Sequence, residues 1–258
     1  MAALRAFKGI MVTGYSHRPV TRAKAGRLLA GVRIFDDAAT CVEGAELVVL
    51  ASPVCTFRRI FEDISPSLGA GCIVTDVGST KVLVSRWAAE KLPAGVCYVG
   101  SHPVAGSERR GLEFARVDLF QGSTCILTGP RRGTAAARLE AFWKGLGCNV
   151  EFMTAARHDR ILANVSHVPH VLAAALVNAV DPGELRYCGT GFLDTSRIAA
   201  GPPSVWSDVL LTNSADIVRG LEKTTAELSK LKKAVAAGDR RAIGRLLGKA
   251  RNRRRTLG

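Results

Sequence analysis

The sequence lacks the cysteine spacing of a disulfide framework or a zinc ribbon. Its seven cysteines are odd in number and scattered, and no two form a C-x-x-C pair. This usage indicates a reducing compartment, and we expect a cytoplasmic protein. The sequence also lacks a long apolar run: VLAAALVNAV, residues 171–180, is too short to span a bilayer, and the N-terminus has no export pattern. We therefore predict no membrane span.

Acidic residues are scarce. Asp and Glu number 22 against 36 Lys and Arg, which gives a formal net charge of +14. This charge suits nucleic acid, but it equally attracts a small polyanionic substrate or a phosphorylated cofactor. The densest basic run, KARNRRRTL at 249–257, has no interleaved aromatic residues and continues a helical pattern. We interpret it as a solvated helix end, with nucleic-acid binding as the weaker alternative.

Short β-rich runs alternate with amphipathic stretches between residue 10 and about residue 150. The runs IMVTGY, ELVVLAS, CIVTDVG, VCYVG and TCILTG are continuous and apolar, as in strands buried on both faces. This alternation predicts an α/β, Rossmann-like, doubly wound parallel sheet over residues 1–152. The pattern of residues 153–258 is helical throughout, with Asn213 and Asp239 placed to cap its last two helices. We therefore predict a second, all-helical domain there.

The first strand and the glycine loop of a dinucleotide-binding domain are missing. Such a domain opens with a strand, a G-x-G-x-x-G turn and a helix whose amides hold the pyrophosphate, and none of these precedes residue 10. The missing strand would leave ladder groups of its neighbours unpaired, at about 1 to 3 kcal/mol for each buried group. Two hypotheses stay open: a start codon that lies further upstream, or a degenerate relative with weak cofactor binding.

Polar residues follow the predicted strands, where open α/β sheets bind their ligands. Ser52 and Pro53 follow one strand, Ser79 lies in DVGSTK after the next, and His102 follows a third. Because the carboxyl ends of parallel strands meet at one edge, we expect these residues in the same crevice. Ser52, Pro53 and Ser79 are our candidates for cofactor contacts at that edge.

The strand IMVTGY is followed by Ser16, His17 and Arg18, with no acidic residue. An NAD enzyme carries Asp or Glu here for the ribose hydroxyls, whereas a hydroxyl beside two potential cations suits the extra phosphate of NADP. We therefore expect NADP or NAD as the cofactor, with NADP favoured. The alternative is that Arg18 stacks on the adenine.

Two histidines of the helical half, His167 and His170, stand three residues apart on one helix face. No acidic residue or cysteine stands at ligand spacing from them, so we predict no metal site. We expect His158 and His167 to be structural. Arg197 lies in GFLDTSRIA, and Trp206 follows it in SVWSDVLL.

Four segments, TDVGSTK, GSHPVAGSERRG, VSHVPH and GFLDTSRIA, occur in an order that resembles the prephenate and arogenate dehydrogenase family of tyrosine biosynthesis. The resemblance covers the chain from residue 10 onward. It implies that His102 accepts the proton of the substrate's ring hydroxyl while hydride passes to nicotinamide, and that Ser79 orients this histidine. It also implies a dimerising helical domain and substrate contacts from Arg197, His170, Trp206 and Ser107.

The chemistry of prephenate explains these residue types. Prephenate is a cyclohexadiene with a hydroxyl opposite a carboxylate, and loss of hydride from the hydroxyl carbon gives a vinylogous β-keto acid that loses carbon dioxide and becomes aromatic. A neutral imidazole can take the hydroxyl proton, and a guanidinium binds a carboxylate at two points. Arg197 has two interpretations, as a residue that binds a substrate carboxylate or as a member of a surface ion pair. Trp206 equally has two, as part of the core or as part of a pocket wall.

These expectations describe an NAD(P)-dependent prephenate dehydrogenase that forms 4-hydroxyphenylpyruvate as a homodimer. Arogenate, which bears an amine in place of the ketone, is the alternative substrate. Alternatives of another class are a non-catalytic dimerising remnant and a basic nucleic-acid-binding protein.

Overall fold

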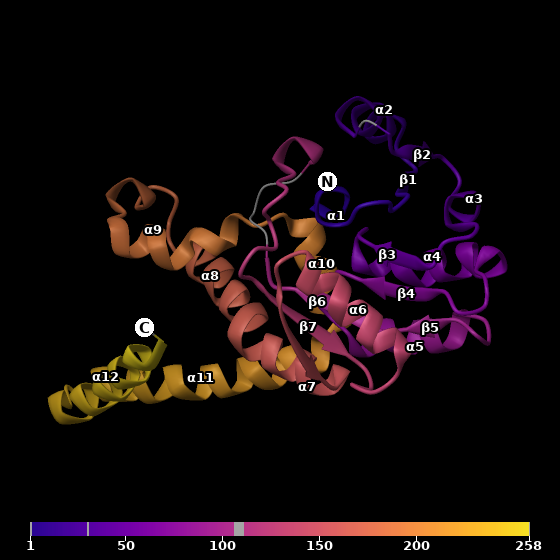
Figure 1. Cartoon of the computed structure of the whole chain (residues 1–258). Helices are drawn as coiled ribbons and strands as arrows, with labels where there is room; N and C mark the ends of the chain where they lie inside the picture. Colours follow the sequence, from indigo (N-terminus) through magenta and orange to yellow (C-terminus); the bar gives the residue numbers. More distant parts are fainter. Residues whose placement is uncertain (1, 30, 106–110, 258) are drawn as a thin grey trace. The chain divides into compact units, whose positions relative to one another are not determined.

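The computed structural model describes residues 2–29, 31–105 and 111–257 of the 258-residue chain. The chain divides into two compact units, Met1–Ser214 and Ala215–Gly258. The first unit contains every strand of the described residues and the helices α1 to α10 (Figure 1). The domain boundary near residue 153 stays a prediction.

The strands form three hydrogen-bonded groups, β1-β2, β3-β4-β5 and β6-β7-β8. Their bounds are β1 Thr13–Tyr15, β2 Arg33–Phe35, β3 Leu47–Leu50, β4 Ile73–Asp76, β5 Cys97–Tyr98, β6 Gly100–Pro103, β7 Thr124–Thr128 and β8 Asn149–Met153. All pairs are parallel except β6 with β7, which is antiparallel, so the prediction of an entirely parallel sheet was wrong for this pair. Strands β2 and β8 were not predicted.

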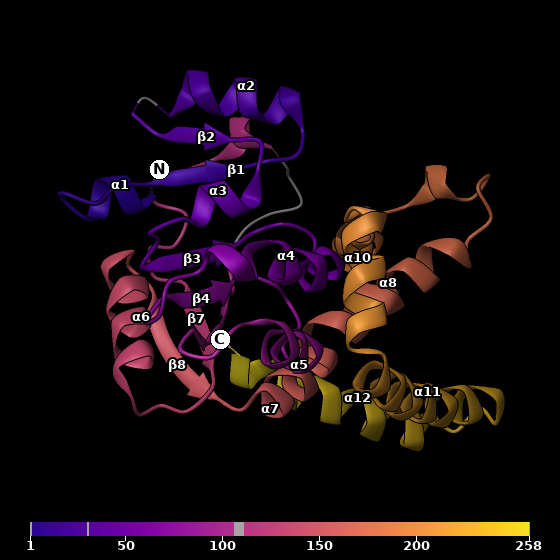
Figure 2. The same ribbon diagram turned by 90° about the vertical axis from the view of Figure 1, so that its right-hand side faces the viewer.

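The second and third strand groups continue into each other, because β5 and β6 belong to one extended segment. The amide of Val99, between them, donates to the carbonyl of Val74 at 3.1 Å, and the hydroxyls of Thr75 and Ser101 lie 2.6 Å apart. Figure 2 shows α6 on one face of this sheet and α4 and α5 on the other, which is the predicted doubly wound arrangement.

The helices of the first unit connect the strands and then succeed one another after β8. Their bounds are α1 Ala2–Ala6, α2 Pro19–Leu28, α3 Ala38–Val42, α4 Phe57–Ile64, α5 Val82–Lys91, α6 Thr134–Gly145, α7 Ala155–Leu162, α8 Val168–Asn178, α9 Thr190–Ser196 and α10 Pro203–Thr212. Short 3-10 helices span Val54–Thr56, Ser65–Ser67, Leu112–Phe114, Leu185–Tyr187 and Arg197–Ala200. A π-helical turn, Ala163–His167, joins α7 to α8.

The sheet is covered by helices whose apolar residues recur at helical spacing. In α4, Phe57, Phe61 and Ile64 fall on one face and are at most 1% exposed. They pack with Val74 and Val84 between the sheet and α5. A separate core cluster, on the strands that α6 covers, is built from large side chains of α6, β7 and the turns beside them. These two cores hold the strand ends in fixed positions.

The turn from β4 into α5 encloses a buried ion pair. The Lys81 ammonium is hydrogen-bonded to Oδ1 of Asp76, and both side chains are 0% exposed. The Tyr98 hydroxyl donates to Oδ2 of Asp76 at 2.6 Å, and the Gly78 amide donates to Oδ1 at 2.7 Å. Because every buried charge here has a hydrogen-bonding partner, the DVGSTK turn is held rigidly.

The continuous helical stretch Ala155–Asn178 is long and apolar enough to cross a membrane, by length and composition. It nevertheless carries His158, Asp159 and His167, whose side chains are at most 1% exposed. These groups are hydrogen-bonded to neighbouring parts of the same unit, an arrangement typical of interior helices. These buried groups attach one side of the stretch to the rest of the unit, whereas other residues of it are exposed, Val165 to 67% and Leu172 to 38%.

The second unit is a pair of helices, α11 Ser214–Ala236 and α12 Arg240–Arg254, followed by a 3-10 turn at Arg255–Leu257. Gly238 turns the chain between them with a φ of +63°, and the Asp239 carboxylate accepts from the Ala242 amide at 2.9 Å. The predicted cap of the last helix is thereby confirmed, and the basic run 249–257 lies on α12 and the 3-10 turn. The predicted cap residue of α11, Asn213, instead has its side-chain amide directed into the first unit.

Candidate active site

His102 lies on β6 opposite Ile126 of β7, and its side chain is buried, with 8% exposure. Its Nδ1 lies 2.8 Å from Nε2 of His158 on α7, and the two rings meet edge to face at 62°. Among the described residues, no donor or acceptor engages Nε2 of His102. The ring is therefore held through one nitrogen and available through the other.

His158 is itself bonded to Asp159, its neighbour on α7. Nδ1 of His158 lies 2.8 Å from Oδ1 of Asp159, and both side chains are at most 1% exposed. The Asp159 carboxylate also accepts from the amides of Lys81 and Val82, each at 2.8 Å, where α5 begins. A carboxylate is favoured at a helix N-terminus because the amides there have no partner within the helix.

Sequence reasoning missed this connection, since it treated His158 as structural and did not consider Asp159. The bond from His102 to His158 joins positions 56 residues apart. Ser79 lies in the β4–α5 turn that Asp159 anchors, is partly buried, and makes no side-chain hydrogen bond within the described residues. Its predicted contact with His102 stays a prediction.

The electrostatic surroundings favour the neutral form of His102. Burial lowers the pKa of His102 well below 6.5, and the nearby Lys81 ammonium lowers it further. A neutral imidazole has a lone pair on one ring nitrogen, so His102 is present as a base at neutral pH.

A second cluster surrounds Trp206 of α10. The His170 ring of α8 stacks on the indole at 3.5 Å between centroids, with 11° between the planes. The His167 ring meets the same indole edge to face at 6.2 Å. Gly201 fits closely against this stack, because a Cβ there would lie 2.5 Å from Nε1 of Trp206. The structure thus brings together two of the predicted substrate-binding residues, His170 and Trp206.

Two imidazole nitrogens of this cluster are buried without a partner in the described residues: Nε2 of His167 and Nδ1 of His170. The other nitrogen of His167 lies 3.2 Å from the Asn213 amide, which can donate to it and leave the proton on Nε2. Burial lowers the pKa of His167 to about 4. Unpartnered buried polar atoms are costly in a completed structure, and they indicate a place for a hydrogen-bonding ligand.

Arg197 begins the 3-10 turn Arg197–Ala200, which packs against α8, and its side chain is exposed. It has no ion-pair partner within the described residues. The structure therefore does not join Arg197 to His170 or Trp206 by a direct bond. Ser107, the remaining predicted substrate-binding residue, lies outside the described residues.

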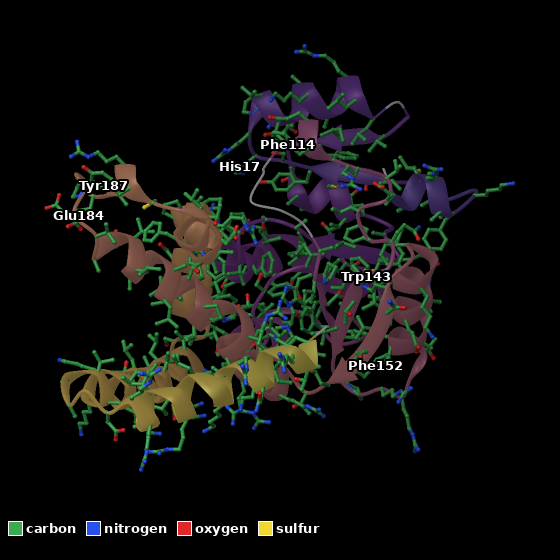
Figure 3. The ribbon with its side chains drawn as sticks, turned by 90° about the vertical axis from the view of Figure 1, so that its left-hand side faces the viewer. His17, Phe114, Trp143, Phe152, Glu184 and Tyr187 are labelled. Atoms are coloured by element: carbon green, nitrogen blue, oxygen red, sulfur yellow. The ribbon has the colours of Figure 1, made fainter. Side chains whose placement is uncertain are left out.

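The predicted cofactor residues lie at strand ends. His17 and Arg18 are exposed and Ser16 is partly buried; all three follow β1 directly, and His17 is labelled in Figure 3. Sequence reasoning missed Arg22, whose Nη1 donates to the carbonyls of Ser16 and His17 at 2.9 and 3.1 Å and so fixes this turn. The hydroxyl, imidazole and guanidinium donors suit the ribose and phosphate groups of a dinucleotide.

Ser52 and Pro53 are exposed at the end of β3, as predicted from the strand pattern. The Ser52 hydroxyl lies 2.7 Å from that of Thr56, in the 3-10 turn that follows. Their assignment to the cofactor stays a prediction.

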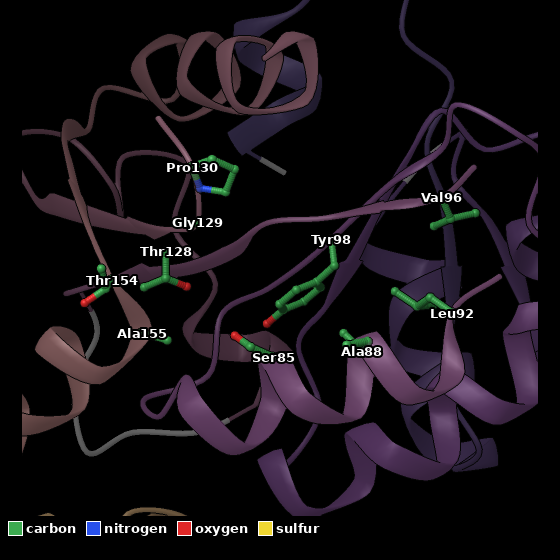
Figure 4. A pocket seen from close by; sticks show the side chains of 11 residues that line it. Ser85, Ala88, Leu92, Val96, Tyr98, Thr128, Gly129, Pro130, Thr154 and Ala155 are labelled. Carbon is green, nitrogen blue, oxygen red and sulfur yellow. The ribbon is translucent and has the colours of Figure 1, made fainter. Parts of the chain in front are cut away.

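A cavity of about 680 Å³ lies beside α5, and His102 is not among the residues that line it. Its walls combine small apolar side chains with the hydroxyls of Ser85, Tyr98, Thr128 and Thr154. Figure 4 shows the Tyr98 hydroxyl directed toward Ser85 at this cavity. Because that hydroxyl also donates to Asp76, Tyr98 stands between the cavity and the buried ion pair.

These features, a nucleotide-binding type of sheet with cationic donors after its strands and a buried neutral imidazole, define a dehydrogenase of the NAD-dependent class. Residues 2–152 match the family described as prephenate dehydrogenase, nucleotide-binding domain, and residues 154–249 match its dimerization domain. The chain belongs to the prephenate dehydrogenase family, an NAD-dependent oxidoreductase family, as the sequence motifs predicted.

Individual relatives agree with this family assignment. The chain is 33% identical to a cyclohexadienyl dehydrogenase of Zymomonas mobilis over 89% of its own length and 81% of the relative's. It is 32% identical to a prephenate dehydrogenase of Bacillus subtilis, over 83% of its own length and 60% of that longer protein's. The prephenate dehydrogenase of Aquifex aeolicus, crystallised with hydroxyphenyl propionate and NAD⁺, superimposes with a TM-score of 0.91 at 28% identity, covering 100% of this chain and 92% of that one.

The buried histidines predict a dependence of stability on pH. Because the pKa of His167 in the folded chain is about 4 and that of an unfolded histidine is about 6.5, the unfolded state binds more protons between these values. Stability from this residue is complete above pH 6.5 and is lost as the pH falls toward 4, by on the order of 3 kcal/mol. His102, whose folded pKa is also lowered, acts in the same direction.

Urea denaturation at pH 7.5, 6.5, 5.5 and 4.5 measures this effect. We expect His167→Gln to flatten the loss of unfolding free energy toward low pH, whatever its stability at pH 7.5. His17→Gln, which replaces an exposed histidine, is the matched control and should follow the original chain. Parallel curves for all three proteins would contradict the assignment.

Proposed function

We propose that this chain catalyses the NAD(P)-dependent oxidative decarboxylation of prephenate to 4-hydroxyphenylpyruvate, a step of tyrosine biosynthesis. The observation that carries the proposal is the buried, neutral imidazole of His102, which is bonded through Nδ1 to His158 and has no hydrogen-bonding partner at Nε2 among the described residues. Membership of the prephenate dehydrogenase family supplies the substrate class. We further infer that the protein acts as a homodimer, since its residues 154–249 match a dimerization domain. We also infer that it is cytoplasmic, because its scattered cysteines indicate a reducing compartment.

His102 accepts the proton of the substrate's ring hydroxyl at Nε2. As the hydroxyl carbon becomes a carbonyl, its hydrogen leaves as hydride, and the bound nicotinamide supplies the acceptor for those two electrons. The bond to the ring carboxylate then breaks and carbon dioxide is released. The electron pair of that bond enters the ring, the carbonyl oxygen becomes a phenolate, and His102 returns its proton to this oxygen. A positioned general base of this kind contributes about 10² to 10⁴ in rate.

The substrate is held by the cluster around Trp206. The stacked pair of His170 and Trp206 provides a flat apolar wall, and the unpartnered nitrogens of His167 and His170 provide polar contacts. Arg197 binds a substrate carboxylate, and Ser79 and Ser107 complete the contacts. Exposure of Arg197 supports this role, because an unpaired guanidinium is available to an anion.

Arogenate is the second candidate substrate. An arogenate dehydrogenase of Synechocystis has a similar structure, with a TM-score of 0.83 at 25% identity. The superposition covers 100% of this chain and 94% of that one. Prephenate and arogenate share the ring, the hydroxyl and the ring carboxylate, so His102 and Arg197 serve both. Parallel assays of both substrates with the same preparation decide between them.

The cofactor is held by Ser16, His17 and Arg18 at the end of β1 and by Ser52, Pro53 and Ser79 at the ends of β3 and β4. We propose a preference for NADP over NAD, because the β1 end carries cationic side chains and no carboxylate. A carboxylate would repel the extra phosphate, whereas a guanidinium can donate to it at two points.

Substitution of His102 by Asn tests the catalytic assignment. We expect His102→Asn to lower kcat with prephenate by about 10² to 10⁴, since an amide cannot accept the proton, while the Kd for prephenate changes little. Reduced-cofactor formation measures kcat, and calorimetric titration measures binding. Lys144→Gln, on the exposed face of α6, is the control and should retain full activity; an equally active His102→Asn protein would contradict the proposal.

Substitution of Arg18 by Ala tests the cofactor preference. We expect kcat/KM with NADP to exceed that with NAD in the original chain, and to fall about 10-fold or more in Arg18→Ala because a charged hydrogen bond is lost. The value with NAD in the same variant is the internal control and should change little. A higher kcat/KM with NAD in the original chain would refute the preference.

A further inference from the structure

We propose that His158 and Asp159 are positioning residues that hold His102 in one tautomer, with the proton on Nδ1 and the lone pair on Nε2. The catalytic consequence of this inference rests on the proposed function, but the tautomer itself does not. Sequence reasoning gave neither residue a part in catalysis, and the structure places both in a buried chain of hydrogen bonds that ends at His102.

The direction of the chain follows from the donors and acceptors. The Asp159 carboxylate can only accept, so Nδ1 of His158, 2.8 Å away, carries a proton. In neutral His158 the other nitrogen, Nε2, then has the lone pair and accepts. Nδ1 of His102, 2.8 Å from it, must therefore donate, which leaves Nε2 of His102 unprotonated.

The hydrogen bonds around His158 fit a ring with one donor, at Nδ1, and one acceptor, at Nε2. The ring is 0% exposed, so its partners are those of the folded chain. The neighbouring cation, Lys81, is paired with Asp76, which in turn accepts from Tyr98. The Asp159 charge is met by the amides of Lys81 and Val82, so it does not need a charged histidine to satisfy it.

Asp159 also fixes where His102 is held. Because its carboxylate binds the first amides of α5, it is tied to the β4–α5 turn, the segment that contains Ser79. The imidazole of His102 is thus connected by hydrogen bonds, through His158 and Asp159, to the same turn that is proposed to face the nicotinamide. When Nε2 takes the substrate's proton, Nδ1 keeps its own proton and donates it more strongly to His158, and the Asp159 charge balances the new cation.

Nitrogen NMR of the full chain, labelled with ¹⁵N-histidine, measures the tautomer without any substrate. The chain has five histidines, and the His102→Asn spectrum identifies the signals of position 102. We expect His102 to show a protonated Nδ1 and an unprotonated Nε2 at pH 7.5. A protonated Nε2 in the original chain would overturn the proposal, whether or not the protein oxidises prephenate.

Two substitutions of His158 test whether this residue determines the tautomer of His102. His158→Phe keeps a ring but has no hydrogen-bond acceptor, so we expect the Nε2-protonated form of His102 to become populated. We expect kcat to fall about 10- to 100-fold with KM nearly unchanged, because part of the rate contributed by the general base is lost. His158→Gln offers an amide oxygen, and it should restore the Nδ1-protonated form and part of kcat. His167→Gln is the spectroscopic control and should leave the tautomer of His102 unchanged.

The outcomes separate the two proposals. An unchanged His102 tautomer in His158→Phe would overturn the positioning role even if kcat fell. The expected tautomer without prephenate oxidation would uphold the positioning chain and count against the proposed function. Should His158→Phe fail to fold, the spectra of the original chain and of His158→Gln still decide, since a protonated Nε2 in either contradicts the proposal.

Discussion

The Asp159 carboxylate is the interaction on which the arrangement of the site depends. It accepts the amide of Lys81, the residue before α5, the first amide of α5, and the Nδ1 proton of His158. One buried side chain thus connects the β4–α5 turn, helix α7 and, through His158, strand β6. Without it, the helix would begin with unpartnered amides and His158 would lose the group that orients it. The position of His102 is therefore a property of the fold rather than of one loop.

The same region shows how buried charge can coexist with a neutral base. Lys81 and Asp76 form a fully buried pair, and Tyr98 and Gly78 satisfy the remaining oxygen positions of the carboxylate. The lysine still lies close enough to lower the pKa of His102, in the direction that burial also imposes. A cation held rigidly beside an imidazole keeps that imidazole unprotonated, which is the form that proton abstraction requires.

The sequence predicted the elements whose physical signal is local. Continuous apolar runs marked β3, β4 and β7. His102 was expected after a strand, but it lies within β6, so its predicted position at a strand end was wrong. Strand β2, with an exposed Arg33 in only three residues, has too short a pattern to detect. The reversed direction of β6 against β7 and the contact of His102 with His158 depend on tertiary packing between distant segments. Position 158 is a lone histidine on a helix in the sequence, and only the fold shows its partner.

A crystal structure of this chain with nicotinamide cofactor and hydroxyphenyl propionate, the ligand bound by the Aquifex aeolicus relative, shows directly whether His102 faces the reacting oxygen. We expect the phenolic oxygen of that ligand about 2.6 to 3.2 Å from Nε2 of His102, with Nδ1 still bonded to His158. A phenolic oxygen bonded to another residue, with His102 turned away from the ligand, would contradict it.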